Sequence, residues 1–228
     1  MKLAIVILFF SILTAQASSP ELPRLFFSYS WLYDSVVCEE ALPEAQWIDE
    51  AKGKTESFSQ IWSIKGPELF NVIFDHTGLG FSRKEMTATL SVCPKKPSYS
   101  DPLVLNVTRF LNSYMSPTIP YGDDDFVDLV FHELLHTWVV ENLEFSQLRR
   151  KYRDEVPSVR SHLHLMAIQK FVYLKLQRPD LVEMLDRLYI RMGGTYGRAW
   201  EIVQIEGHEA FIREFPVSAD TSGSKVIY

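Results

Sequence analysis

The stretch DDDFVDLVFHELLHTWVVENL, residues 123–143, decides how this sequence is read. Bulky apolar residues recur along it at helical spacing, and three aspartates stand at its start, where a helix dipole favours negative charge. The pattern therefore predicts a buried helix that ends near Glu144. This helix carries His132, Glu133 and His136 in the order His-Glu-x-x-His.

The spacing of these three residues predicts a metal site with a base beside it. Residues four apart lie on one face of a helix, so His132 and His136 can bind one ion. Neutral imidazole nitrogen suits Zn²⁺. Glu133 is turned by about 100°, so it cannot easily share the ion but can accept a proton from a water activated there. The alternative is a core helix with two hydrogen-bonded histidines.

The run His132-Glu133-Leu134-Leu135-His136 resembles the active-site motif of the zincin superfamily of zinc metallopeptidases. The resemblance covers this helix firmly and the rest of the chain in outline. It implies Zn²⁺ as cofactor, His132 and His136 as ligands, Glu133 as general base, and a peptide or protein substrate. The metzincin extension and the aspzincin Gly-Thr-x-Asp are absent, so the chain is placed in neither of these subfamilies. The resemblance implies a gluzincin-like enzyme with a histidine as third ligand, and we expect it to be secreted and bacterial.

Catalytic zinc usually has three protein ligands and one open position, and three residues are candidates for the third ligand. Glu155 lies 19 residues beyond His136, but its charged surroundings favour a surface position. His162 and His164 belong to a long apolar helix, about 200° apart around it, so both cannot easily bind one ion.

The choice between these two histidines comes from the resemblance. The gluzincin helix that supplies the third ligand often reads Glu-x-x-Ala, and His164-Leu165-Met166-Ala167 has that form with histidine in place of glutamate. We therefore expect His164 as the third ligand, with His162 as the alternative.

Other polar residues can assist the site. Asp128 lies one turn before His132 and can hydrogen-bond a ligand imidazole, although a surface charge is an equal alternative. Tyr196, His208 and Glu206 are candidates for stabilising an oxyanion. The alternation over Met86–Val92 predicts a strand, which can be an edge strand that pairs with a peptide substrate or an interior strand.

The predicted fold class is α+β, with one zincin-like metallohydrolase domain over residues 18–228. Residues 18–122 form its mixed part, with strands expected at 85–93 and 101–110 and a helix pair broken at Gly66-Pro67. Residues 123–216 form its helical part, with helices from Ser158 to about Gln177 and from Pro179 to Gly193. Residues 217–228 are expected to be a loose tail.

The beginning of the chain predicts export. Residues 1–17 combine Lys2, a short apolar run and Ala15-Gln16-Ala17, the pattern of a cleavable signal peptide, so the mature chain would start near Ser18 and have no membrane span. An oxidising compartment would let the two cysteines, Cys38 and Cys93, form a disulfide, and two separate thiols are the alternative.

Composition narrows the function. The 228 residues include 46% hydrophobic and 23% charged ones, as in soluble globular proteins, and the net charge of −6 disfavours nucleic-acid binding. Together these observations predict a secreted or periplasmic zinc metallopeptidase. The alternative is an exported zinc-binding protein that acts as an interaction module without hydrolysing peptides.

Overall fold

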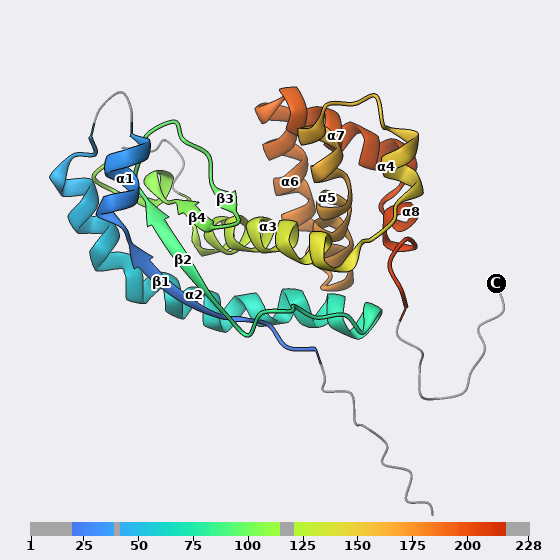
Figure 1. The fold of residues 1–228 in the computed structure, drawn as a ribbon, viewed down its shortest axis with the longest axis horizontal. Helices are drawn as coiled ribbons and strands as arrows, with labels where there is room; N and C mark the ends of the chain where they lie inside the picture. The colour runs from blue at the N-terminus through green and yellow to red at the C-terminus, as the bar shows by residue number, and fades with distance from the viewer. Residues whose placement is uncertain (1–19, 39–41, 115–120, 218–228) are drawn as a thin grey trace, which may run out of the picture.

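The structure, a computed structural model, describes residues 20–38, 42–114 and 121–217. Within these ranges it has eight α-helices and one mixed four-stranded sheet, which confirms the α+β class (Figure 1). The predicted signal peptide, residues 1–17, and the predicted tail from residue 218 onward lie outside the described residues.

The elements are β1 (Arg24–Tyr29), α1 (Trp31–Val37), α2 (Ala45–Thr77), β2 (Glu85–Ser91), β3 (Tyr99–Ser100), β4 (Leu103–Asn106), the 3-10 helix η1 (Thr108–Phe110), α3 (Asp123–Asn142), α4 (Gln147–Lys151), α5 (Pro157–Lys175), α6 (Pro179–Met192), α7 (Gly194–Glu206) and α8 (His208–Ile212).

The sheet has the strand order β1-β2-β4-β3, with β3 antiparallel to β4 and the other pairs parallel. The strand predicted at Met86–Val92 is confirmed as β2, and its residues Met86, Ala88 and Leu90 are buried. The suggestion that β2 is an edge strand was wrong. β1 pairs with β2 along all six residues from Arg24 to Tyr29, and β4 pairs with its other edge, so β2 lies in the interior of the sheet.

Helix α2 is continuous through Gly66-Pro67, so the predicted break was wrong. Proline inside a helix costs about 3 kcal/mol, and burial of α2 against β1 and α3 outweighs that cost. Close packing explains the glycine at position 66, because a Cβ there would lie 2.6 Å from the ring of Trp62. The helix ends at Gly78, which adopts a left-handed φ of 71°. Figure 1 shows α2 running beneath β1, β2 and α3.

The His-Glu-x-x-His helix is confirmed as α3, which ends at Asn142. The three aspartates occupy its first turn, and the Asp125 carboxylate accepts a hydrogen bond from the backbone N–H of Gly122 at 2.8 Å. Helix α3 packs between α2 and α5, while α6, α7 and α8 pack around α5 (Figure 1). The two later helices predicted from the sequence are confirmed as α5 and α6. This packing places α5, with its two histidines, directly beside α3.

A disulfide joins Cys38 at the end of α1 to Cys93 beyond β2, with a Cα–Cα distance of 5.4 Å, so of the two alternatives the disulfide is the one formed. Next to it the buried Asp34 carboxylate accepts hydrogen bonds from the Ser91 hydroxyl at 2.6 Å and the Val92 amide at 3.0 Å. The disulfide is compatible with an exported protein. In the described ranges, no helix combines the length and the apolar character that a membrane crossing requires.

Candidate metal centre

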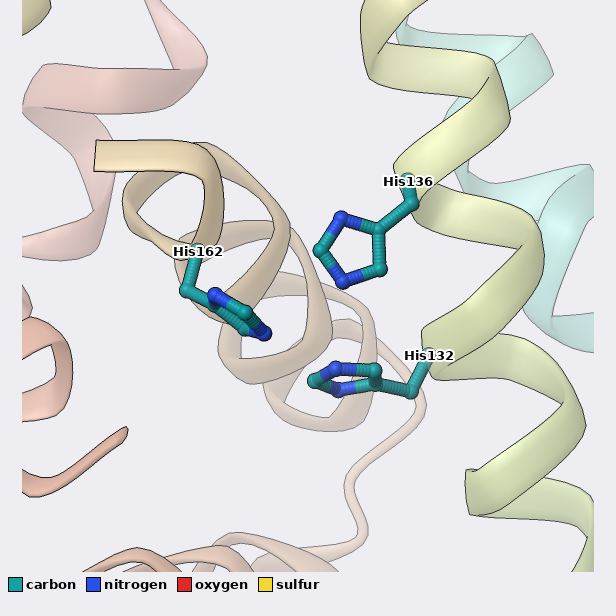
Figure 2. Close-up of side chains that lie close together, drawn as sticks. All are labelled: His132, His136 and His162. Atoms are coloured by element: carbon teal, nitrogen blue, oxygen red, sulfur yellow. The ribbon is translucent and has the colours of Figure 1, made fainter. Parts of the chain in front are cut away.

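Three histidines from two helices converge between α3 and α5. His132 and His136 come from α3 and His162 comes from α5, and one ligand nitrogen of each lies within 4.8 Å of the others. Their ring centroids are 4.7 to 5.4 Å apart. Figure 2 shows the three imidazoles pointing toward a common centre. Three neutral imidazoles are a ligand set that suits Zn²⁺ and other first-row divalent ions.

Hydrogen bonds fix which nitrogen of His162 faces this centre. Its Nδ1 lies 2.6 Å from the carbonyl oxygen of Ser158, so Nδ1 must carry the hydrogen and donate it. The other nitrogen, Nε2, is buried and has no hydrogen-bond partner among the described residues. A buried nitrogen lone pair without a partner costs free energy, and a bound metal ion would satisfy it.

His132 is held in a similar way by a buried polar network. Its Nδ1 lies 3.3 Å from Gln169 Oε1 and 3.2 Å from the Tyr189 hydroxyl, and that hydroxyl donates to Gln169 at 2.7 Å. Gln169 Nε2 in turn donates to the Asp128 carboxylate at 2.8 Å, as Tyr173 does at 2.6 Å. Asp128 therefore supports His132 through Gln169, and the direct bond to an imidazole suggested by the sequence is not formed.

Burial keeps the three imidazoles neutral, which is the form that binds metal. It lowers the pKa of His132 well below its usual range, and the neighbouring His136 and His162 lower it further. Burial and the proximity of His162 lower the pKa of His136 to about 4. The pKa of His162 is also lowered by burial, although its bond to Ser158 opposes the change.

Glu133 and Tyr196 lie beside the histidines, where a cavity of about 380 Å³ is lined by both of them and by His132. Burial raises the pKa of Glu133 to about 8, against the opposing charge of Arg109. A metal ion next to it would favour the ionised carboxylate instead. The ring of Tyr196 lies 4.5 Å from that of His162 and 6.2 Å from that of His132.

The expectation that His164 completes the ligand set is corrected to His162. His164 points to the other side of α5, where its ring packs against Phe211 and Phe215 and its Nε2 lies 2.8 Å from Glu214. The packing of α5 explains why His162 and not His164 joins the other two histidines. The face of α5 that carries His162 meets α3, whereas the face that carries His164 meets α8 and the residues after it.

Other residues predicted from the sequence lie away from the three histidines. Glu155 forms an ion pair with Arg198 at 2.7 Å. Glu206 binds Lys151 and Tyr152, and His208 lies 3.2 Å from Glu209. Of the three oxyanion candidates, only Tyr196 lines the cavity.

Sequence reasoning missed Ser158, Gln169 and Tyr189 as supporting residues. A signal for two of them was present, because Ser158 lies one turn before His162 and Gln169 lies seven residues after it, on the same face of one helix. Polar residues on one stripe of an otherwise apolar helix indicate that the stripe faces a polar site. Tyr189 comes from α6 and carried no such signal.

Comparisons of the chain with protein-family models, with curated proteins and with solved structures find no match in any of the three. The site is therefore interpreted from its own residues and geometry.

Proposed function

We propose that this protein is a secreted, zinc-dependent metallopeptidase of zincin type, with His132, His136 and His162 as ligands and Glu133 as general base. One observation carries the proposal. A third buried histidine, from a different helix, meets the His-Glu-x-x-His pair with its Nε2 unpartnered among the described residues. A core helix with two hydrogen-bonded histidines would not need that convergence.

The surroundings of the three histidines suit hydrolysis. Zn²⁺ bound here would supply a Lewis acid that polarises a carbonyl group and makes water more acidic. Glu133 would take a proton from the attacking water as the oxygen of that water bonds to the carbonyl carbon, and would pass the proton to the amine nitrogen as the C–N bond breaks. The Tyr196 hydroxyl, in the same cavity, would donate a hydrogen bond to the carbonyl oxygen as its charge develops.

Two features favour hydrolysis over a zinc-binding interaction module. A structural zinc site usually has four protein ligands, whereas the group found in the described part of the chain has three. Glu133 and His132 also line a cavity of about 380 Å³, so water and a substrate can reach the site from the His132 side.

The outer strand β3 offers a place for an extended peptide. It pairs only with β4 in the described sheet and lies beside α3, where the Thr137 hydroxyl donates to the Ser100 carbonyl at 3.4 Å. Pro97 and Ser98, directly before β3, line the cavity. A peptide that added to this edge by main-chain hydrogen bonds would run past the histidines.

The test combines metal analysis with one substitution. Protein purified without chelator should contain about one zinc per chain, as a single three-histidine site implies. Glu133→Gln should keep that zinc while cleavage of a random peptide library falls by at least about 1000-fold, because the base is lost. Glu144→Gln, on an exposed position beyond α3, is the matched control and should cleave normally.

Two results would contradict the proposal. The first is protein that contains no zinc and takes up none when zinc is added. The second is a Glu133→Gln variant that cleaves peptides as fast as the unchanged protein.

A further inference from the structure

The cavity next to the three histidines has a basic wall. The cavity is lined by Lys95 and Lys96, which follow β2, and by Arg109, from η1, together with the α3 residues His132 and Glu133. The chain as a whole has a net charge of −6, whereas the lining of this cavity includes three basic residues and two acidic ones. Such a concentration raises the local concentration of anions.

The guanidinium of Arg109 packs against two aromatic rings. Its guanidinium carbon lies 5.0 Å from the centre of the Phe110 ring and 5.2 Å from that of Tyr121, as in cation–π packing. Its Nε is buried and has no hydrogen-bond partner among the described residues. Arginine carries five N–H donors in a planar fork that matches a carboxylate. Because Arg109 lines the cavity, the terminal N–H groups of this fork would be the donors to a carboxylate bound there.

The two carboxylates of the cavity are engaged elsewhere. Asp128 accepts hydrogen bonds from Tyr173 at 2.6 Å and from Gln169 at 2.8 Å. Glu133 lies beside the proposed zinc ligands and is the proposed base. Burial raises the pKa of both carboxyl groups and the positive charge of Arg109 acts to lower it, but neither forms an ion pair with Arg109 in the part of the chain that the structure describes. A ligand carboxylate would therefore not have to displace either of them from the guanidinium.

We infer that this cavity is an anion-binding subsite, in which Arg109, flanked by Lys95 and Lys96, binds a carboxylate of the peptide substrate next to the bond that is cleaved. The inference rests on the proposed function and adds its substrate class. The carboxylate is either the free C-terminus of a peptide or the side chain of an aspartate or glutamate. Leu129, Leu188 and Met192 line the same cavity and provide apolar contact for the rest of that residue.

The test uses four matched pools of fluorescently labelled random hexapeptides. They end in a free carboxylate or an amide, and they contain or lack aspartate and glutamate. Binding is measured on zinc-loaded Glu133→Gln protein, in which cleavage is expected to be at least about 1000-fold slower. Cleavage is measured on protein with Glu133 intact. Each is repeated with Arg109→Gln, with Arg109→Lys, and with Arg153→Gln, whose side chain is 79% exposed, as the matched control.

Peptides with a carboxylate should bind about 10- to 100-fold more tightly than the neutral pool, the range for a charged hydrogen bond. Arg109→Gln should abolish this preference without changing zinc content or the binding of the neutral amidated pool. Arg109→Lys should restore part of it, and Arg153→Gln should have no effect. If only the pools with a free C-terminus bind more tightly than the neutral amidated pool, the enzyme is a carboxypeptidase. If the acidic amidated pool also binds more tightly, the enzyme cleaves beside acidic residues.

Equal binding of all four pools, or an equal effect of Arg109→Gln on charged and neutral peptides, would overturn the subsite. That result would leave the proposed function standing if the protein with Glu133 intact still cleaves the pools. A preference for carboxylates that depends on Arg109, without cleavage of any pool, would refute the peptidase and retain the subsite.

Discussion

His162 donates its Nδ1 hydrogen to the carbonyl oxygen of Ser158, one turn earlier in α5, over 2.6 Å. Because a carbonyl oxygen can only accept, this bond sets the tautomer and leaves a lone pair on Nε2, the nitrogen without a partner among the described residues. The imidazole is therefore oriented as a ligand by its own helix. Such supporting bonds typically change metal affinity by about 10- to 100-fold.

The first prediction separates the two histidines of α5. His162→Ala should weaken zinc binding by more than about 100-fold, beyond the effect of losing a supporting residue, because it removes a bond to the ion. His164→Ala is the matched control and should retain zinc affinity, since its ring lies against Phe211 and Glu214. Affinity is measured by competition with a chelator at fixed pH, because protonated histidine does not bind. Loss of zinc in His164→Ala alone would refute the assignment of His162.

The second prediction concerns the Tyr196 hydroxyl. Tyr196→Phe should lower kcat by about 100-fold, the effect of losing one donor to a developing oxyanion, while zinc content stays the same. Tyr152→Phe is the control, because that hydroxyl binds Glu206 away from the cavity and its loss should leave kcat unchanged. An unchanged kcat in Tyr196→Phe would show that the hydroxyl does not act in catalysis and that Tyr196 only packs against His162.

The third prediction is a pH dependence of stability that comes from Glu214. Burial alone would raise the pKa of this carboxyl, but hydrogen bonds from His164, Ser146 and the Leu148 amide bring it to about 2. An ordinary glutamate has a pKa of about 4.3, so the unfolded chain takes up the proton first. The stabilisation is therefore complete above about pH 5 and is lost as the pH falls toward 2.

Substitution of Glu214 isolates this contribution. Glu214→Gln should be less stable than the unchanged protein at pH 7, and the difference should shrink as the pH falls from 5 to 2. Urea unfolding at a series of pH values measures it. Glu209→Gln, at a carboxylate whose side chain is 63% exposed, is the control. A difference that does not vary with pH would show that the Glu214 carboxylate is not stabilising through its charge.

The fourth prediction concerns the disulfide. Closing a loop of 55 residues should stabilise the fold by roughly 4 kcal/mol. The Cys38→Ser, Cys93→Ser double variant should unfold at correspondingly lower urea concentration, and the unchanged protein should behave like it after reduction. Equal stability of the oxidised and reduced protein would contradict this.

The sequence predicted the elements whose stability is local or strongly patterned. Helix α3 and its pair of stacked histidines follow from a single run of residues, and so does the alternation that marks β2. For Cys38 and Cys93 the sequence left two alternatives, a disulfide or separate thiols, and the structure shows the disulfide. None of these predictions depended on knowing which other element lay alongside.

The errors arose where the answer depended on a distant partner. Gly66-Pro67 reads as a break, yet α2 continues because β1 and α3 bury its apolar side. His162 and His164 both lie in α5, and only the arrival of α3 on one face and α8 on the other distinguishes them. The motif form that favoured His164 describes sequence spacing, whereas a ligand is selected by the face that meets the metal.

The disulfide also has a consequence for the cavity lined by His132 and Glu133. Cys93 lies two residues before Lys95, at the start of the segment that forms the basic wall of the cavity, and its bond to Cys38 anchors that segment to α1. The three histidines are instead held by α3 and α5, which that bond does not touch. In a reducing compartment the protein would thus retain its metal ligands but lose the anchor of its substrate-binding wall. The reduced and oxidised forms would then bind zinc equally and differ in their preference for carboxylates, if the basic wall binds the substrate as proposed.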